Sequence, residues 1–277
     1  MPELPEVQTV IADLIESELI GCKLTGIDVH DARIVTEPAP AQFRRRLLGK
    51  NITNIHRRGK YIIFDLTGKL HLLIHLRMSG HLYLVPKTSL RQAHDHIILH
   101  LDDGRKLRYH DPRKFGRFFL VDHPQKIVGK LGPEPLSDSF TGKKLTQMIS
   151  TRKRMLKPLL LDQTFIAGLG NIYTDEALWR AHLHPCRNSA TLADIDIKRL
   201  YRAIRLVLRS GIKNKGTTLG GGETGFNSST GKQGDNRSKL KVFRRVNLPC
   251  PHCRTIIRRI VVGQRSTFFC EKCQPLN

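Results

Sequence analysis

The sequence predicts a multi-domain α+β protein, in which a strand-rich N-terminal half precedes a helical segment and a cysteine-rich C-terminal module. Short strand patterns fill residues 24–122, helical periodicity follows a Gly/Pro-rich break at 131–135, and two Cys-x-x-Cys pairs lie near the end. A chain of 277 residues can form two modest domains or one large one. We expect three segments: 1–130, 131–238 and 239–277.

An amphipathic helix is expected over residues 7–20. Apolar side chains recur there at helical spacing, and Gly21 is a plausible C-terminal stop. Such a helix would hold the residues before it in place instead of letting them fray.

Strand signals dominate the region that follows. Residues 61–66 and 70–75 flank a Thr67-Gly68 turn, and residues 97–101 and 106–109 flank Asp103-Gly104, which is typical of a β-hairpin. Short strands at this spacing indicate a sandwich or a barrel.

Helices are expected over 141–150 and 192–210 beyond the break, the second starting at a capping-box-like pair, Thr191 and Asp194. Residues 214–238 contain seven glycines and are mostly polar, so they cannot pack as a core. This segment is either a flexible linker or a mobile loop that closes over a ligand.

The C-terminal cysteines have the spacing of a structural metal site. Cys250 and Cys253 are separated by sixteen residues from Cys270 and Cys273, which matches a four-thiolate zinc site around a β-hairpin. Four thiolates leave zinc no open position, so we expect one structural zinc ion. A pair of redox-active motifs is the alternative, but no βαβ unit surrounds these cysteines.

The composition points to a nucleic-acid partner. The formal net charge is +23 with a pI near 10.2, and residues 239–277 carry nine Lys/Arg against one acidic residue. We expect no membrane association, because no apolar run is long enough to cross a bilayer and no secretory signal is present. The cysteines follow a metal-site pattern and not a disulfide framework, which favours a reducing compartment.

The second residue, Pro2, offers unusual chemistry if Met1 is removed, as we expect. A terminal α-amine has a pKa near 8, so roughly a tenth of it is neutral at pH 7 and could attack a sugar aldehyde carbon without further tuning. Glu3 lies beside it as a possible proton donor or acceptor. The alternative is a start codon followed by an ordinary loop.

Other motifs are open to a functional and a structural interpretation. Asn171, after two glycines at a helix start, suits a phosphate or a plain helix corner. Phe115 beside Arg113, and likewise Met78, could wedge into a base stack or simply fill the core. His94 could contact phosphate or pack in the core, and with His96 it forms only a weak metal motif.

Together these motifs resemble those of bacterial formamidopyrimidine-DNA glycosylase, and they occur in the same order over nearly the whole chain. The resemblance rests on residues 2–7, on Gly170-Asn171-Ile172-Tyr173, and on residues 264–270 with the four cysteines. It implies an N-terminal β-sandwich with an N-terminal helix, then a helix-two-turns-helix domain that ends in the zinc hairpin.

The resemblance also implies a bifunctional enzyme that excises 8-oxoguanine and formamidopyrimidines from double-stranded DNA and then cleaves the strand at the abasic site. By similarity, Pro2 is the nucleophile and Glu3 the proton donor. Lys60 would act in β-elimination, and Arg265 in δ-elimination and phosphate binding. The implied protein is a monomer of the bacterial cytoplasm, associated with the nucleoid.

Further positions are implied to contact DNA. His94, Arg113 and Arg152 match DNA contacts, Lys157 and Asn171 would hold phosphates, and Met78, Arg113 and Phe115 would fill the gap left by the everted nucleotide. Residues 231–237 and 243–245 depart from the family pattern in or beside the expected base-capping loop. The alternatives are an endonuclease VIII-like enzyme for oxidised pyrimidines and a non-catalytic zinc-ribbon binder of damaged DNA.

Overall fold

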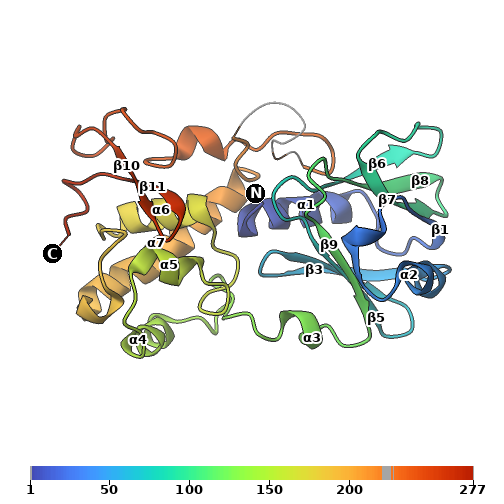
Figure 1. Ribbon diagram of the computed structural model, residues 1–277, viewed down its shortest axis with the longest axis horizontal. Helices are drawn as coiled ribbons and strands as arrows, with labels where there is room; N and C mark the ends of the chain where they lie inside the picture. The colour runs from blue at the N-terminus through green and yellow to red at the C-terminus, as the bar shows by residue number, and fades with distance from the viewer. Residues whose placement is uncertain (1, 220–225, 227, 277) are drawn as a thin grey trace. The chain divides into compact units, whose positions relative to one another are not determined.

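The computed structural model describes residues 2–219, 226 and 228–276, and it divides into two compact units (Figure 1). The first comprises Met1–Gly129 with Ile212–Arg237, and the second comprises Lys130–Gly211 with Ser238–Asn277. Residues 212–237 therefore group with the strand-rich unit and not with the helical segment to which the sequence assigned them. Within this unit, Glu6 bonds the backbone of Thr217, and Phe226 packs in the hydrophobic core.

The first unit is built on two β-sheets. The first sheet has the strand order β1 (Leu24–Val29), β7 (Asp95–Leu101), β8 (Arg105–His110), β6 (His81–Pro86). The second has the order β2 (Val35–Glu37), β9 (Arg117–Val121), β5 (Leu70–His75), β4 (Tyr61–Leu66), β3 (Ile52–Arg58). Buried side chains of both sheets belong to one hydrophobic core, so the sandwich alternative is correct.

The two hairpins expected from the sequence are present. The strands β4 and β5 have the predicted bounds, and their turn contains Gly68 and Lys69 with φ of 80° and 57°. In the β7–β8 turn, Gly104 has φ of 82°, a conformation that glycine adopts without steric cost.

The N-terminal helix α1 covers Leu4–Glu16, and so begins and ends earlier than expected. Pro5 lies in the first turn, where no backbone donor is needed, and Glu3 with Glu6 forms a capping box. The helix packs against β3 and β4. Short helices complete this unit: η1 (Ala32–Ile34), α2 (Pro40–Leu47), α3 (Gln125–Val128), with η3 (Asn236–Lys239) at its boundary.

The second unit consists of helices and one hairpin. Its elements are α4 (Gly142–Ser150), α5 (Leu156–Leu161), α6 (Asn171–Arg180), η2 (Ser189–Thr191), α7 (Asp194–Lys213, which extends just past the unit boundary), β10 (Arg258–Val262) and β11 (Arg265–Phe269). Helix α6 packs against both α5 and β11. Over the described residues, none of the helices combines the length and apolarity that a membrane crossing requires.

The predicted cap of α7 is wrong. The Thr191 hydroxyl donates to the Asn188 carbonyl (2.9 Å), and it is Asp196 that accepts the backbone N–H of Ala193 (3.3 Å). Thr191 is drawn into the preceding 3₁₀ turn, so the acidic residue one turn into the helix takes over the capping role.

Candidate active site and nucleic-acid interface

Pro2 and Glu3 are buried at the start of α1, in the first unit. The backbone N–H of Glu3 donates to Glu6 Oε2 at 2.8 Å, and the Glu3 carboxylate accepts the backbone N–H of Glu6. These reciprocal bonds fix the backbone that follows Pro2, so the candidate nucleophile is held by a rigid helix end.

Glu6 also connects this helix end to the glycine-rich segment. Its Oε1 accepts the backbone N–H of Thr217 at 2.8 Å, and a Cβ at Gly216 would lie 3.0 Å from both Glu6 Cγ and the Phe226 ring. Phe226 is buried in the core of the same unit. The described part of this segment is therefore packed and is not a free linker, whereas residues 220–225 and 227 of the predicted loop lie outside the described residues.

Lys60 is 7% exposed and lies in the turn between β3 and β4. Arg57 holds this turn: its Nε donates to Gln8 Oε1 on α1 at 3.1 Å, and its guanidinium donates to the Gly59 carbonyl at 2.9 Å. The turn that contains Lys60 is thus anchored to the helix that follows Pro2.

His75 lies beside this turn as a neutral imidazole. Burial, together with the Arg77 and Lys60 cations, lowers the pKa of His75 to about 3. The backbone N–H of Arg77 donates to His75 Nδ1 at 3.0 Å, which requires that nitrogen to be unprotonated. His75 therefore adds no positive charge next to Lys60 at neutral pH.

Two loops of the same unit present apolar side chains to solvent. Met78 is 40% exposed and Phe115 is 43% exposed, so the interpretation of these residues as core is wrong. The Arg113 guanidinium carbon lies 4.7 Å from the centre of the Phe115 ring. One loop thus offers a flexible apolar group, and the other offers a flat apolar ring beside a cation.

His94 is half-buried, and its ring lies 5.6 Å from that of His110. Its neighbour His96 bonds the Asp111 carbonyl oxygen through Nε2 at 3.0 Å. This bond commits His96 to a structural partner, and the weak metal motif at 94–96 does not assemble in the described chain.

In the second unit, Lys157 is fully buried. Its Nζ donates to Asp175 Oδ1 at 2.7 Å and to the Ser266 carbonyl at 2.9 Å. The Asn171 side-chain amide donates to the same carbonyl at 2.9 Å. The ammonium of Lys157 is therefore directed at β11 and not at solvent, which corrects the expectation of a direct phosphate contact.

Asp175 completes this arrangement by accepting the backbone N–H of Phe268 at 3.0 Å. Burial raises the pKa of Asp175 to about 7, against the opposing influence of Lys157. Helix α6 thus holds the strand in which Arg265 is the first residue. Gly170, and not Asn171, is the N-cap of that helix.

Arg265 and Arg152 are both exposed, as phosphate-binding groups must be. Arg265 follows a two-residue turn in which Gly263 and Gln264 have φ of 55° and 61°, as a type I′ hairpin requires. Arg152 follows helix α4, and its carbonyl accepts the Ser189 hydroxyl at 2.9 Å.

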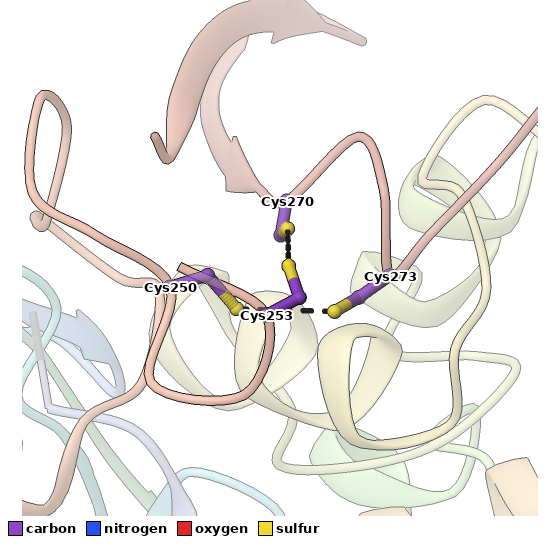
Figure 2. A group of neighbouring side chains, drawn as sticks. All are labelled: Cys250, Cys253, Cys270 and Cys273. Carbon is purple, nitrogen blue, oxygen red and sulfur yellow. Dashed lines mark hydrogen bonds between the residues drawn. The ribbon is translucent and has the colours of Figure 1, made fainter. Parts of the chain in front are cut away.

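The four C-terminal cysteines converge, as Figure 2 shows, and they are the one group with metal-ligand geometry in the part of the chain described. All four Sγ atoms lie within 4.8 Å of one another, and the Cys250–Cys273 pair is 3.8 Å apart. A tetrahedral zinc–thiolate site with bonds of about 2.3 Å places its sulfurs about 3.8 Å apart. The cluster fits one structural zinc ion, held by Cys250, Cys253, Cys270 and Cys273.

Sequence reasoning overlooked three carboxylates that organise these groups: Glu6, Asp111 and Asp175. Glu6 could have been found, because a glutamate three residues after Glu3 is the acidic half of a capping box. Asp111 precedes Pro112 at the end of a strand, where an aspartate commonly bonds backbone N–H groups of the following turn. Asp175 gave no signal, because its partners are distant in the sequence.

Family models match most of the chain in three consecutive segments. Residues 1–118 match the formamidopyrimidine-DNA glycosylase N-terminal domain, residues 131–221 match its H2TH domain, and residues 247–276 match a zinc finger found in FPG and IleRS. The chain is 44% identical over 274 residues to the formamidopyrimidine-DNA glycosylase of Protochlamydia amoebophila, covering 99% of each chain. The Herpetosiphon aurantiacus protein of the same name is 42% identical, with 99% and 100% covered.

Solved structures agree with this result. A Lactococcus lactis FPG mutant, in complex with DNA containing Fapy-dG, superposes with a TM-score of 0.92 at 35% identity, covering 99% of this chain and all of that one. The MutM (FPG) protein of Thermus thermophilus gives 0.89 at 37% identity, with both chains fully covered. The fold and site define a DNA-repair enzyme with a structural zinc ion. The chain belongs to the formamidopyrimidine-DNA glycosylase family.

Proposed function

We propose that this protein excises oxidised purines, including 8-oxoguanine and formamidopyrimidines, from double-stranded DNA and cleaves the strand at the resulting abasic site. The observation that carries the proposal is the rigid burial of Pro2 and Glu3 at the capped start of α1 in a member of this glycosylase family. The DNA complexes of relatives support the substrate class: the L. lactis proteins were crystallised with Fapy-dG DNA and with abasic-site DNA.

The nucleophile is the nitrogen of Pro2 after removal of Met1. It attacks the sugar C1′ as the C1′–base bond breaks, and the base leaves with the proton released from the nitrogen. Glu3 then donates a proton to the ring oxygen as the C1′–O4′ bond breaks and the sugar ring opens. The product is an iminium that has no N–H proton to lose, so it keeps its positive charge and remains an electron sink for elimination.

Lys60 and Arg265 act in the elimination steps. Lys60 serves β-elimination, in which the proton at C2′ is lost and the bond to the 3′ phosphate breaks. Arg265 binds phosphate and serves δ-elimination on the 5′ side. The fixed β3–β4 turn and the fixed β11 strand support these roles, because a group that moves a proton must be held within hydrogen-bond reach.

DNA binding uses polar and basic side chains of each unit. His94 and Arg113 contact the DNA from the first unit, and Arg152 from the second. Lys157 and Asn171 contribute by holding the Ser266 carbonyl, and through it the strand of Arg265. Met78, Arg113 and Phe115 fill the space left when the target nucleotide is everted, which offsets part of the unstacking cost of a few kcal/mol.

Borohydride trapping tests the proposal. Borohydride reduces an iminium to a stable amine, so the protein should become covalently linked to DNA containing 8-oxoguanine or an abasic site. Pro2→Gly should weaken trapping, whereas Pro5→Ala, which changes a proline three residues along, should retain it. An intact mass with Met1 removed is the required check. Correctly processed, zinc-loaded protein that forms no adduct would exclude the mechanism.

The relatives named above are bacterial proteins, which supports action in a bacterial cell. We propose that the protein acts there as a monomer on the nucleoid in the cytoplasm. Lesion choice is tested separately, by comparing excision of 8-oxoguanine with that of thymine glycol. Faster excision of thymine glycol would favour the endonuclease VIII-like alternative.

A further inference from the structure

Asp111 is a fully buried carboxylate at the end of β8, within the first unit. Its Oδ1 accepts the Ser79 hydroxyl (2.5 Å) and the backbone N–H of Arg113 (3.2 Å). Its Oδ2 accepts the Tyr109 hydroxyl (2.9 Å) and the backbone N–H of Gly116 (2.9 Å). One carboxylate therefore bonds four donors, which uses the capacity of both oxygens.

The donors flank the three proposed void-filling residues. Ser79 follows Met78, Gly116 follows Phe115, and Arg113 itself is bonded through its backbone. Two loops that are distant in the sequence are thus held by a single side chain. Each loop also contains a non-glycine residue in the left-handed region, Arg77 and Lys114, both with φ of 58°. Such conformations persist only where surrounding contacts impose them.

The Tyr109 hydroxyl occupies the space between the loops. A Cβ at Gly80 would lie 2.4 Å from that oxygen, and one at Gly116 would lie 1.6 Å from it. Glycine at both positions allows both loops to close on the Tyr109–Asp111 pair, so neither loop can shift without disturbing it.

Asp111 is itself held by strand β7 and by the residue that precedes this strand. Its N–H donates to the His94 carbonyl (3.0 Å), and its carbonyl bonds His96 Nε2 (3.0 Å). Burial alone would raise the pKa of Asp111, but the bonds from Ser79, Gly116 and Tyr109 outweigh burial and hold the pKa below its ordinary value. The acceptor is therefore an ionised carboxylate attached to the rigid sheet.

We propose that Asp111 is the positioning residue that sets Met78, Arg113 and Phe115 in place as one unit before DNA binds. The inference rests on the proposed function, since it concerns how the gap in the duplex is filled. Pre-set loops avoid the ordering cost that flexible wedges would incur during base eversion.

The test uses Asp111→Asn in the full-length, zinc-loaded protein. An asparagine has one carbonyl oxygen, so it loses two of the four donors whichever way the amide faces. Two assays are run at saturating enzyme: single-turnover excision of 8-oxoguanine, with 2-aminopurine in the duplex to report unstacking, and cleavage of a preformed abasic site. Excision and the rise in 2-aminopurine fluorescence that reports unstacking should both slow about tenfold or more, because buried donors are left unbonded. Abasic cleavage should fall by less, because a nucleotide without a base is cheaper to evert.

Two further variants separate positioning from folding. Ser79→Ala removes only the bond to the Met78 loop and should give a smaller loss in the same direction. Asp95→Asn alters an equally buried carboxylate whose partners, including Tyr83 and Arg108, lie outside both loops. It should lower thermal stability without slowing the rise in 2-aminopurine fluorescence more than it slows abasic-site cleavage.

Wild-type-like excision by Asp111→Asn would overturn the inference. The inference would also fail if Asp111→Asn lost equal activity on 8-oxoguanine DNA and abasic-site DNA and Asp95→Asn showed the same losses. If the unmodified protein neither excises 8-oxoguanine nor forms a borohydride adduct, the proposed function fails instead. The two failures are therefore distinguishable.

Discussion

Single buried carboxylates hold the candidate functional groups in both units. Glu6 holds the backbone of Glu3 and Thr217, and Asp111 holds two exposed loops. Asp175 bonds the backbone of Phe268 and so holds the strand that begins with Arg265. In each case the carboxylate accepts hydrogen bonds from backbone N–H groups, and such bonds are strong and directional in a buried environment. The reactive or exposed residue is thus left to meet substrate while its neighbour supplies rigidity.

His75 predicts a pH dependence of stability. The folded protein lowers its pKa from 6.5 to about 3, so the unfolded chain binds the proton more readily between these values. The free energy of unfolding should therefore fall as pH drops below 6.5, by about 2 kcal/mol near pH 5 from this residue alone. Urea unfolding at pH 7 and 5 measures the change, and His75→Gln should reduce it.

A matched control for His75→Gln is His123→Gln, which changes an exposed histidine beyond β9. It should retain the acid sensitivity of the unmodified protein. Equal acid sensitivity of the protein and His75→Gln would contradict the assignment of this effect to His75.

At the level of elements, the β10–β11 turn determines where Arg265 lies. Gly263 is required twice: for its left-handed φ of 55° and for space, since a Cβ would lie 3.0 Å from Pro158 Cγ on α5. We expect Gly263→Ala to lower the free energy of unfolding by about 1–2 kcal/mol and to reduce the δ-elimination product. Thermal unfolding and gel analysis of cleaved abasic DNA measure the two effects.

Gly104→Ala provides the comparison for Gly263→Ala. It imposes the same left-handed strain in the β7–β8 hairpin, but a Cβ there meets nothing within 4 Å. This variant should lose stability and keep the product ratio. A changed ratio in both variants would show that the Pro158 contact does not control Arg265.

Zinc should be required for the hairpin to fold. Structural zinc contributes folding free energy directly, so Cys270→Ser or chelation should unfold β10–β11 and lower DNA affinity by about 100-fold or more. Binding titrations with metal analysis measure this. Cys186→Ser, outside the cluster, should retain both zinc and affinity. Full affinity of metal-free protein would contradict a structural role.

The elements that were predicted correctly depend on local signals. The β4–β5 hairpin follows from its turn residues and apolar strands, and the zinc site follows from cysteine spacing. The start of α1 was misplaced because Leu4 and Pro5 look like a loop until the Glu3–Glu6 capping box is recognised. The burial of Lys157 could not be predicted, because its partner Ser266 is 109 residues away in the sequence.

At the scale of the whole molecule, the charge is a property of the surface and not of the fold. The net charge is +23, whereas the buried charged groups include paired ions such as Arg108–Asp95, whose charges cancel. The excess of positive charge is therefore available to a polyanion. It raises encounter rates and affinity without sequence preference.

Binding to DNA should accordingly fall steeply with salt. A protein that neutralises roughly 6–10 phosphates loses about 10³–10⁵ in affinity between 50 and 200 mM salt, and each phosphate contact adds about 0.9 to the slope. Arg152→Gln and Arg265→Gln should each lower the slope by about one. Lys69→Gln is the control, because this exposed lysine lies in the β4–β5 turn, at the opposite end of the six-residue strand β4 from Lys60, and should leave the slope unchanged. Fluorescence anisotropy over a salt series measures the slopes.

A flat salt response of the unmodified protein would exclude a phosphate-dominated interface. Equal slopes for all three variants would exclude Arg152 and Arg265 as phosphate contacts.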